Sequence, residues 1–204
     1  MDTKFFIFLT FLTSFLISAQ NYSEDDVFER TKDDYMIIKP SVDKSIKAKI
    51  KPIIEKKIND LIEHSKNEYS TLSAKEIEYA KDTLTISEYI NEYNNYQASS
   101  STFGMNRAIQ FSNWEYDKLL NKYYKSALEM LKPEMKKQLI NSQKKWLDYY
   151  NSERVFINNL QDFGNHNFLV YASGYSDKIL IDRVQFLVDI YQEKMQGSST
   201  YKEN

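Results

Sequence analysis

The chain has 204 residues with 27 basic and 29 acidic side chains, so its formal net charge is only −2. This near-neutral balance gives no general electrostatic attraction to nucleic acid, and the absence of cysteine excludes thiol catalysis and cysteine zinc sites. Only four glycines and three prolines interrupt the chain, which favours long helices and short connections.

The first nineteen residues have the pattern of a cleaved secretory signal peptide. Lys4 supplies a positive charge, an apolar run follows from Phe5 to Ile17, and Ala19 is the small residue at the cleavage point. As a helix the run spans about 20 Å, whereas a membrane core needs about 30 Å. Cleavage before Gln20 is therefore favoured over a membrane anchor, and we expect an exported protein without a stable membrane span.

The segment after the cleavage point begins with residues 20–40, which predict a short helix or an ordered strap. Ser41 is interpreted as the N-cap of a helix whose apolar residues recur at three- and four-residue spacing as far as Ile62. Pro52 should kink this helix or start a new one. Lysines fill the opposite face, which suits either a solvated surface or a helix lying on a membrane.

A second helix is predicted to begin after Ser73, because Glu76 three residues later completes a capping-box pattern. Ser87 interrupts the apolar stripe of this helix, so the stripe does not define the C-terminal end of the helix. Residues 91–102 are rich in asparagine and serine and predict a linker.

Three further helices are predicted in the second half. An apolar stripe starts at Trp114 and ends at Leu131, and Pro133 then stops one helix and opens the next. That next helix carries apolar residues from Leu139 to Leu160. Residues 161–175 contain glycine and asparagine breakers and predict a loop, followed by a last helix from about Ser176.

These elements predict an all-α fold, a small bundle of long antiparallel helices with additional helices at the N-terminus. No strand alternation is strong enough to indicate a sheet. We expect four parts along the chain: a signal peptide (1–19), an N-terminal helical segment (20–95), a C-terminal helical domain (96–195) and a flexible tail (196–204).

No catalytic constellation is visible. The two histidines, His64 and His166, are about a hundred residues apart, and neither has a nucleophile or metal-ligand partner in a recognised spacing. We therefore expect a protein that is not an enzyme, with no cofactor and no metal ion.

The second half of the chain contains a spaced set of polar, aromatic and aliphatic residues, which are Met105-Asn106, Asp117, Leu120-Asn121, Tyr124, Leu139, Ser142-Gln143, Trp146, Glu153, Arg183-Val184 and Leu187. As a set, these residues resemble the LprI-type family of exported lysozyme inhibitors. The resemblance covers about residues 100–190.

The chain also departs from the family pattern. Ala108, Arg154 and Tyr175 stand where the family has cysteines, and Tyr150-Asn151 replaces its Arg-Asp pair. The chain thus resembles a cysteine-less variant of the family that also lacks the Arg-Asp pair.

Most motif residues have a structural explanation on helix faces. An unpaired buried polar group costs about 1–3 kcal/mol, so the polar members should bond to one another or to backbone, with Glu153–Arg183 as the pair to test. The motif residues to which we assign this structural role are Asn121, Tyr124, Gln143, Trp146, Glu153 and Arg183.

The resemblance implies a binding protein, whose partner is lysozyme or another peptidoglycan-cleaving enzyme, in a Gram-negative periplasm. The candidate contacts lie in the predicted loop and are Phe163, Asn165, His166 and Asn167; an aromatic residue such as Phe163 suits an interface anchor. Two alternatives stay open. One is an exported structural or accessory protein that kept the fold, and the other is an immunity protein against a wall-degrading toxin. The sequence does not indicate the oligomeric state.

Overall fold

The computed structural model describes residues 28–30, 36–67, 71–96, 102–160 and 166–193, so the predicted signal peptide and tail lie outside the described residues. It confirms the all-α bundle of long helices. The elements in chain order are β1 (Phe28–Arg30), β2 (Met36–Ile38), α2 (Pro40–Asn67), α3 (Ala74–Tyr93), α4 (Thr102–Met130), α5 (Pro133–Asn159) and α6 (His166–Tyr191).

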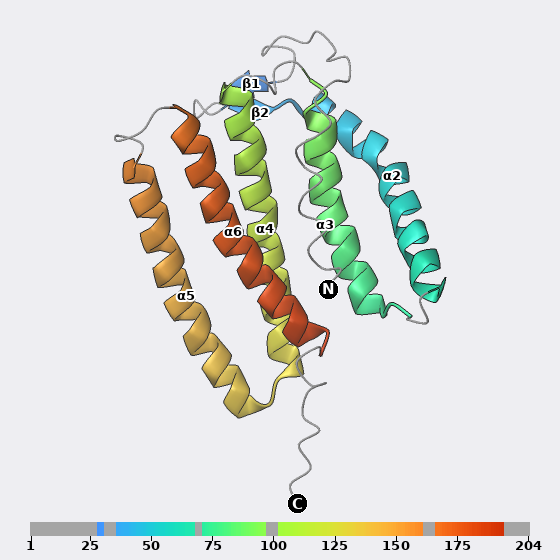
Figure 1. Cartoon of the computed structure of the whole chain (residues 1–204), viewed down its shortest axis with the longest axis vertical. Coiled ribbons are helices and arrows are strands. Elements are labelled where there is room, and N and C mark those ends of the chain that lie inside the picture. The colour runs from blue at the N-terminus through green and yellow to red at the C-terminus, as the bar shows by residue number, and fades with distance from the viewer. Residues whose placement is uncertain (1–27, 31–35, 68–70, 97–101, 161–165, 194–204) are drawn as a thin grey trace, which may run out of the picture.

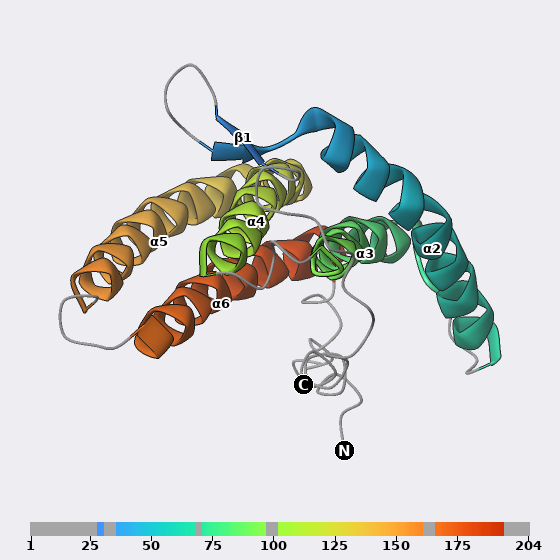
Figure 2. The same ribbon diagram turned by 90° about the horizontal axis from the view of Figure 1, so that it is seen from above.

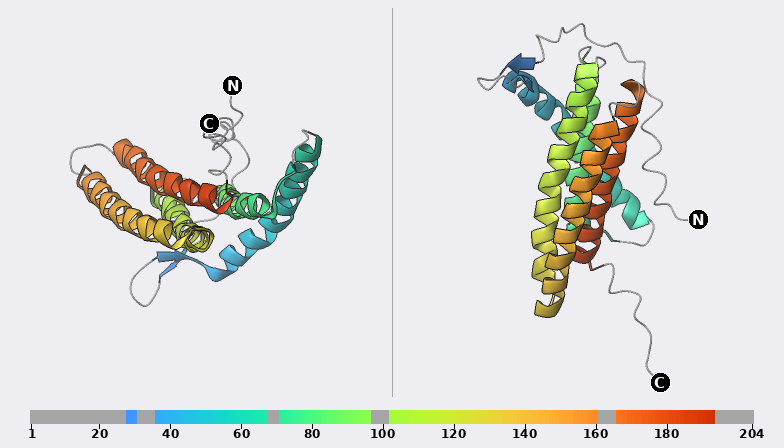
Figure 3. Two further views of the ribbon diagram at one scale, coloured as in Figure 1. Left: turned by 90° about the horizontal axis from the view of Figure 1, so that it is seen from below. Right: turned by 90° about the vertical axis from the view of Figure 1, so that its left-hand side faces the viewer.

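The helices α4, α5 and α6 form a three-helix group, with α3 beside it and α2 at the outer edge (Figures 1 and 2). Within the group α4 and α6 run in the same direction and α5 runs against them. Figure 3 shows α2 crossing the remaining helices at an angle. None of the described helices is long and apolar enough to cross a membrane.

The main core lies where α6 packs against α4. Tyr123 from α4 and Val184, Leu187 and Val188 from α6 have no exposed surface. These positions follow the three- and four-residue spacing that places side chains on one helix face. Leu139 and Tyr150 from α5 and Ile86 from α3 complete the same cluster.

A second, smaller core joins α2 to α3. Ile46 and Ile50 of α2 are buried against Tyr89 and Tyr93 of α3. The ring of Tyr89 also stacks on Phe111 of α4, with centroids 4.0 Å apart. Because α3 contributes to both cores, it connects α2 to the three-helix group.

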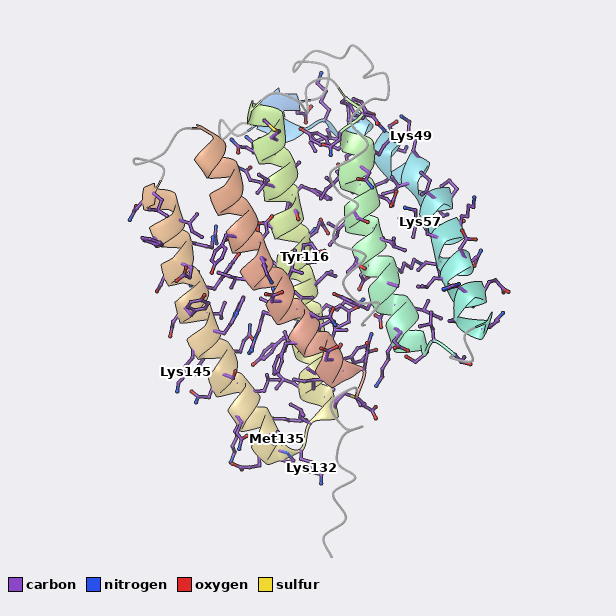
Figure 4. The ribbon with its side chains drawn as sticks, in the orientation of Figure 1. Lys49, Lys57, Tyr116, Lys132, Met135 and Lys145 are labelled. Carbon is purple, nitrogen blue, oxygen red and sulfur yellow. The ribbon has the colours of Figure 1, made fainter. Side chains whose placement is uncertain are left out.

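Two ion pairs reinforce the contact between α2 and α3. Lys49 Nζ lies 2.6 Å from Glu92 Oε1, and Lys57 Nζ lies 2.6 Å from Glu88 Oε1; both lysines are labelled in Figure 4. Glu88 is buried. Part of the lysine-rich face of α2 therefore meets acidic side chains of α3, a use of this face that we did not predict.

Several helix boundaries were predicted correctly. Ser73 and Glu76 form the predicted capping box at the start of α3. Pro133 is the first residue of α5, where its missing N–H costs no hydrogen bond. The prediction of Ser41 as an N-cap was wrong, because α2 already begins at Pro40 and continues through Pro52 as one helix. Figure 2 shows that this helix is curved.

The structure corrects the prediction for residues 20–40. In place of a helix, the described part contains a short antiparallel hairpin, in which Phe28 pairs with Ile38 and Arg30 with Met36. Proline disfavours helical backbone in the residue before it, so Pro40 keeps the preceding segment extended.

Both predicted linkers are shorter than expected. Residues 91–93 belong to α3, because Tyr93 is buried and donates a hydrogen bond to the Gly104 carbonyl oxygen at 3.0 Å. Residues 166–175 belong to α6. A single helical glycine such as Gly174 costs about 1 kcal/mol relative to alanine, which is less than the packing of the rest of α6 contributes.

Trp114 was wrongly placed on the core stripe and is 65% exposed. Positions two apart do not share a helix face, so Trp114 points away from the core side that Tyr116 occupies. Lys118 Nζ lies 4.4 Å from the centre of its ring.

A polar network links α3 to α4 above the main core. Lys122 Nζ lies 2.6 Å from Asp82 Oδ2 and 2.7 Å from Glu78 Oε1, and the Tyr123 hydroxyl donates to the same Asp82 oxygen at 2.7 Å. Burial disfavours the lysine charge, but the bonds to Asp82 and Glu78 outweigh it and raise the pKa of Lys122.

The carboxyl group of Asp177, between α4 and α6, has no such hydrogen bonds within the described structure that outweigh the effect of its burial. Burial raises the pKa of Asp177 from 3.8 to about 6, and the hydrogen bond from the Asn113 side chain offsets only part of this shift. The Asp177 Oδ1 atom has no hydrogen-bond partner among the described residues. The ionised form of Asp177 therefore destabilises the fold.

This raised pKa predicts a pH-dependent effect of Asp177→Asn. The folded chain holds the Asp177 proton more tightly than the unfolded chain, so its contribution is favourable below pH 4 and is lost as the pH rises through about 6. At pH 7.5 we expect Asp177→Asn to raise the free energy of unfolding by about 1–3 kcal/mol, with the gain disappearing towards pH 4. Urea denaturation across this pH range measures the effect. The exposed Asp148→Asn serves as the control, and equal effects of the two substitutions would contradict the assignment.

Candidate functional site

The motif residues that come together in space lie between α5 and α6. Arg183 of α6 donates from Nε to Gln143 Oε1 at 2.9 Å, and from Nη2 to Ser142 Oγ at 3.3 Å. Gln143 is buried on the inner face of α5. A buried amide oxygen needs a donor, and Arg183 supplies it across the helix interface.

Aromatic rings enclose the Arg183 side chain on two sides. Its guanidinium carbon lies 5.7 Å from the ring centre of Trp146 on α5 and 5.0 Å from that of Phe186 on α6. These distances fall within the range for attraction between a cation and a ring face. Trp146 is itself held by Tyr150, whose ring stacks on it at 5.0 Å with planes 10° apart.

Arg183 makes no ion pair with any residue in the described part of the chain. The adjacent Asp182 instead accepts from Lys178 at 2.6 Å. Burial lowers the pKa of Arg183, and only the nearby Tyr124 acts in the opposite direction. The site therefore holds a half-buried positive charge that has amide and hydroxyl acceptors but no carboxylate within the described structure.

An open cavity of about 400 Å³ lies over this charge. Its walls come from both helices and include Trp146, Tyr149, Tyr175, Arg183 and Phe186. A second cavity of about 440 Å³ continues from Phe186 towards the end of the hairpin where α5 begins. Apolar side chains dominate this second cavity, including Met130, Met135, Leu139 and Ile190. We call the two cavities together the α5–α6 groove.

Some of the predicted motif residues lie at this groove and others lie away from it. Gln143, Trp146 and Arg183 meet there, and Tyr124 packs on the adjacent core. Asn121 is exposed on α4, where its Nδ2 donates to the Asp117 carbonyl oxygen at 2.9 Å.

The predicted Glu153–Arg183 pair is not formed, because Arg183 takes Gln143 and Ser142 as its partners. Sequence spacing favours polar partners on facing helices but does not fix the rotation of each helix about its axis. Gln143 and Glu153 are ten positions apart on α5, which corresponds to about 15 Å along the helix axis. Arg183 can therefore reach only one of them.

The structure describes the predicted contact residues only in part. Phe163 and Asn165 fall outside the described residues, and His166 and Asn167 are the first two residues of α6. Their side chains are likewise outside the described part, so their role as partner contacts stays a prediction.

The sequence reasoning missed the aromatic lining of the groove. Tyr149 and Tyr175 are 47% and 57% exposed, and Phe186 is 36% exposed. A signal was present on α5, where three of four positions at seven-residue spacing are apolar, Met135, Tyr149 and Phe156, with Ser142 as the fourth. This spacing places them on one helix face, beside the stripe of Trp146, and predicts a second, mainly apolar face.

The family model described as Lysozyme inhibitor LprI matches residues 94–183. The match spans α4, α5 and α6 as far as Arg183, and it confirms the predicted resemblance across the C-terminal half of the chain. Searches of curated proteins and of solved structures each found no match.

The environments of Arg183 and Lys122 predict different costs for removing each charge. Arg183→Gln removes a desolvated cation without a carboxylate partner, and the amide nitrogen of the new glutamine can still donate to Gln143, so we expect it to change the free energy of unfolding by less than about 1 kcal/mol. Lys122→Gln leaves Glu78 and Asp82 without their shared counterion and should cost about 1–2 kcal/mol at low salt. Urea denaturation of both variants makes the comparison. A larger loss for Arg183→Gln than for Lys122→Gln would contradict the prediction.

Proposed function

We propose, on the basis that residues 94–183 match the lysozyme-inhibitor family, that this chain is a non-enzymatic protein that binds a peptidoglycan-cleaving enzyme and blocks it by occlusion. The family match is the observation that carries this proposal. The matched segment covers α4, α5 and the part of α6 up to Arg183, and the three helices share a buried core that includes Tyr123, Val184 and Leu187. Such a core supports a rigid surface, and rigidity lowers the entropic cost of binding.

The binding surface we propose is the α5–α6 hairpin. Residues 161–167, which include the first two residues of α6, are proposed to enter the active-site cleft of the target, with Phe163 as the aromatic anchor. Phe156 is exposed in the last turn of α5, next to this segment, and supports the choice, because exposed aromatic side chains are frequent in interfaces.

One observation favours a second candidate, an exported structural or accessory protein. Tyr150, which replaces the arginine of the family pattern, is buried and stacks on Trp146. Its ring contributes to the core, so the position no longer offers an exposed charge to a partner. A chain that kept the fold and lost the inhibitor role would show this kind of exchange.

The inhibitor proposal predicts that the purified protein slows the cleavage of peptidoglycan by lysozyme in a saturable manner. Phe163→Ala should weaken inhibition at least tenfold, equivalent to about 1.4 kcal/mol. Trp114→Ala removes an exposed aromatic residue from α4, outside the hairpin, and should have no effect. The measurement is a titration into assays of animal and bacterial lysozymes. Neither binding nor inhibition with any of them would overturn this proposal and favour the accessory role.

We also propose export to the periplasm, with cleavage between Ala19 and Gln20. The support is the sequence pattern of Lys4 and the apolar run Phe5–Ile17. The intact mass of the protein recovered from the envelope fraction should correspond to a chain starting at Gln20. Recovery of the uncleaved chain from the cytoplasm would contradict export.

A further inference from the structure

The α5–α6 groove is longer than a small-molecule site requires. Its lining on α6 begins at Tyr175 and ends at Ile190, with Glu193 just beyond the end of the helix. The fifteen helical steps from Tyr175 to Ile190 correspond to about 22 Å at a rise of about 1.5 Å per residue. A groove of this length matches a helix of about four turns, which is the occupant in the helix-in-groove mode of recognition.

The groove also has the composition of a protein interface. Interface cores are enriched in aromatic residues, methionine and arginine. The groove presents Met135, Tyr149, Tyr175 and Phe186 with substantial exposed surface, together with Arg183. Methionine side chains are flexible and adapt to the shape of an incoming apolar residue. Met135 is labelled near the lower end of α5 in Figure 4, on the same helix as Lys145.

The charges around the groove define the partner further. Arg183 has no carboxylate partner within the described structure, although its burial between Trp146 and Phe186 makes an unpaired charge costly. The other charged residues that line the groove are paired within the chain, Lys178 with Asp182 and Glu193 with Lys75. Among the described lining residues, the charge of Arg183 is therefore the one left for a partner. An acidic partner would complement this charge.

We propose that the α5–α6 groove docks an acidic amphipathic helix of a partner protein. A carboxylate of this helix pairs with Arg183, and its apolar residues enter the cavity around Met135 and Ile190. The docked helix lies against α5 and α6 and extends the three-helix group to four helices. The inference deepens the proposed binding role, on which it rests for a protein partner, but its test needs no peptidoglycan-cleaving enzyme.

The test uses the single-tryptophan variant Trp114→Phe, in which Trp146 becomes the only tryptophan and reports on the groove. The probes are two 18-residue amphipathic helical peptides with the same leucine face. One carries glutamate on its polar face, and its twin carries lysine at the same positions. We expect the acidic peptide to change Trp146 fluorescence in a saturable manner and to bind at least tenfold more tightly than the basic twin at low salt.

Substitutions in the same background test the contacts. Arg183→Gln should weaken binding of the acidic peptide at least tenfold and reduce the preference over the basic twin, since charge-assisted bonds are the strong ones. Phe186→Glu and Tyr175→Ala should each weaken binding of both peptides. Arg107→Gln removes an arginine from α4, outside the groove, and should leave both affinities unchanged. Circular dichroism and urea denaturation verify that each variant is folded.

Three results would overturn the proposal. The first is no response of Trp146 to either peptide. The second is equal affinity for the two peptides together with no effect of Arg183→Gln on binding. This result would show that charge does not contribute to recognition. The third is a concentration-dependent dimer that Phe186→Glu abolishes, which assigns the groove to a second copy of the chain. Lysozyme inhibition is measured separately, so failure of the inhibitor proposal and failure of this docking site are distinguishable.

Discussion

The contact between α4 and α6 is the interaction on which the remaining structure depends. Tyr123, Val184, Leu187 and Val188 bury their side chains completely in this contact, although α4 and α6 are separated in the chain by the whole of α5. This contact fixes the position of α6 along its helix axis and so brings Arg183 opposite Gln143 of α5. It therefore determines where along the α5–α6 groove the positive charge of Arg183 lies. The family pattern has cysteines at the positions of Ala108, Arg154 and Tyr175, but this chain contains none. The packing of α4 against α6 must therefore stabilise the fold without disulfide bonds.

Much of the fold could be predicted because its signals are local. The capping box of Ser73 and Glu76 and the proline at the start of α5 each act within one helical turn, so tertiary contacts do not override them. The errors arose where packing outweighed local preference. Tyr93 continues α3 into an asparagine-rich stretch because its ring is buried, and α6 runs through Gly174 because its later residues are held by α4.

The candidate site was predictable only in part. Gln143, Trp146 and Arg183 could be selected from the family motif, but the Gln143–Arg183 bond depends on the rotation and vertical offset of two helices, which periodicity does not encode. The same holds for Phe186, which has no motif signal and becomes part of the site because it lies one turn beyond Arg183 at the junction of two cavities. Tyr150 shows the reverse case, since a departure from the motif that cast doubt on function proved to be a core residue.

The position of α2 has a consequence for how the molecule loses structure. Its apolar face packs mainly on α3, through Ile46 and Ile50 against Tyr89 and Tyr93. Opening of α3 therefore removes the packing partner of α2, whereas α2 can detach while the α4–α6 contact stays closed. Because the core between α4 and α6 contains more buried residues than the core between α2 and α3, we expect the α4–α6 contact to have the higher opening free energy of the two. Binding at the α5–α6 hairpin can thus be independent of fluctuations at the opposite edge.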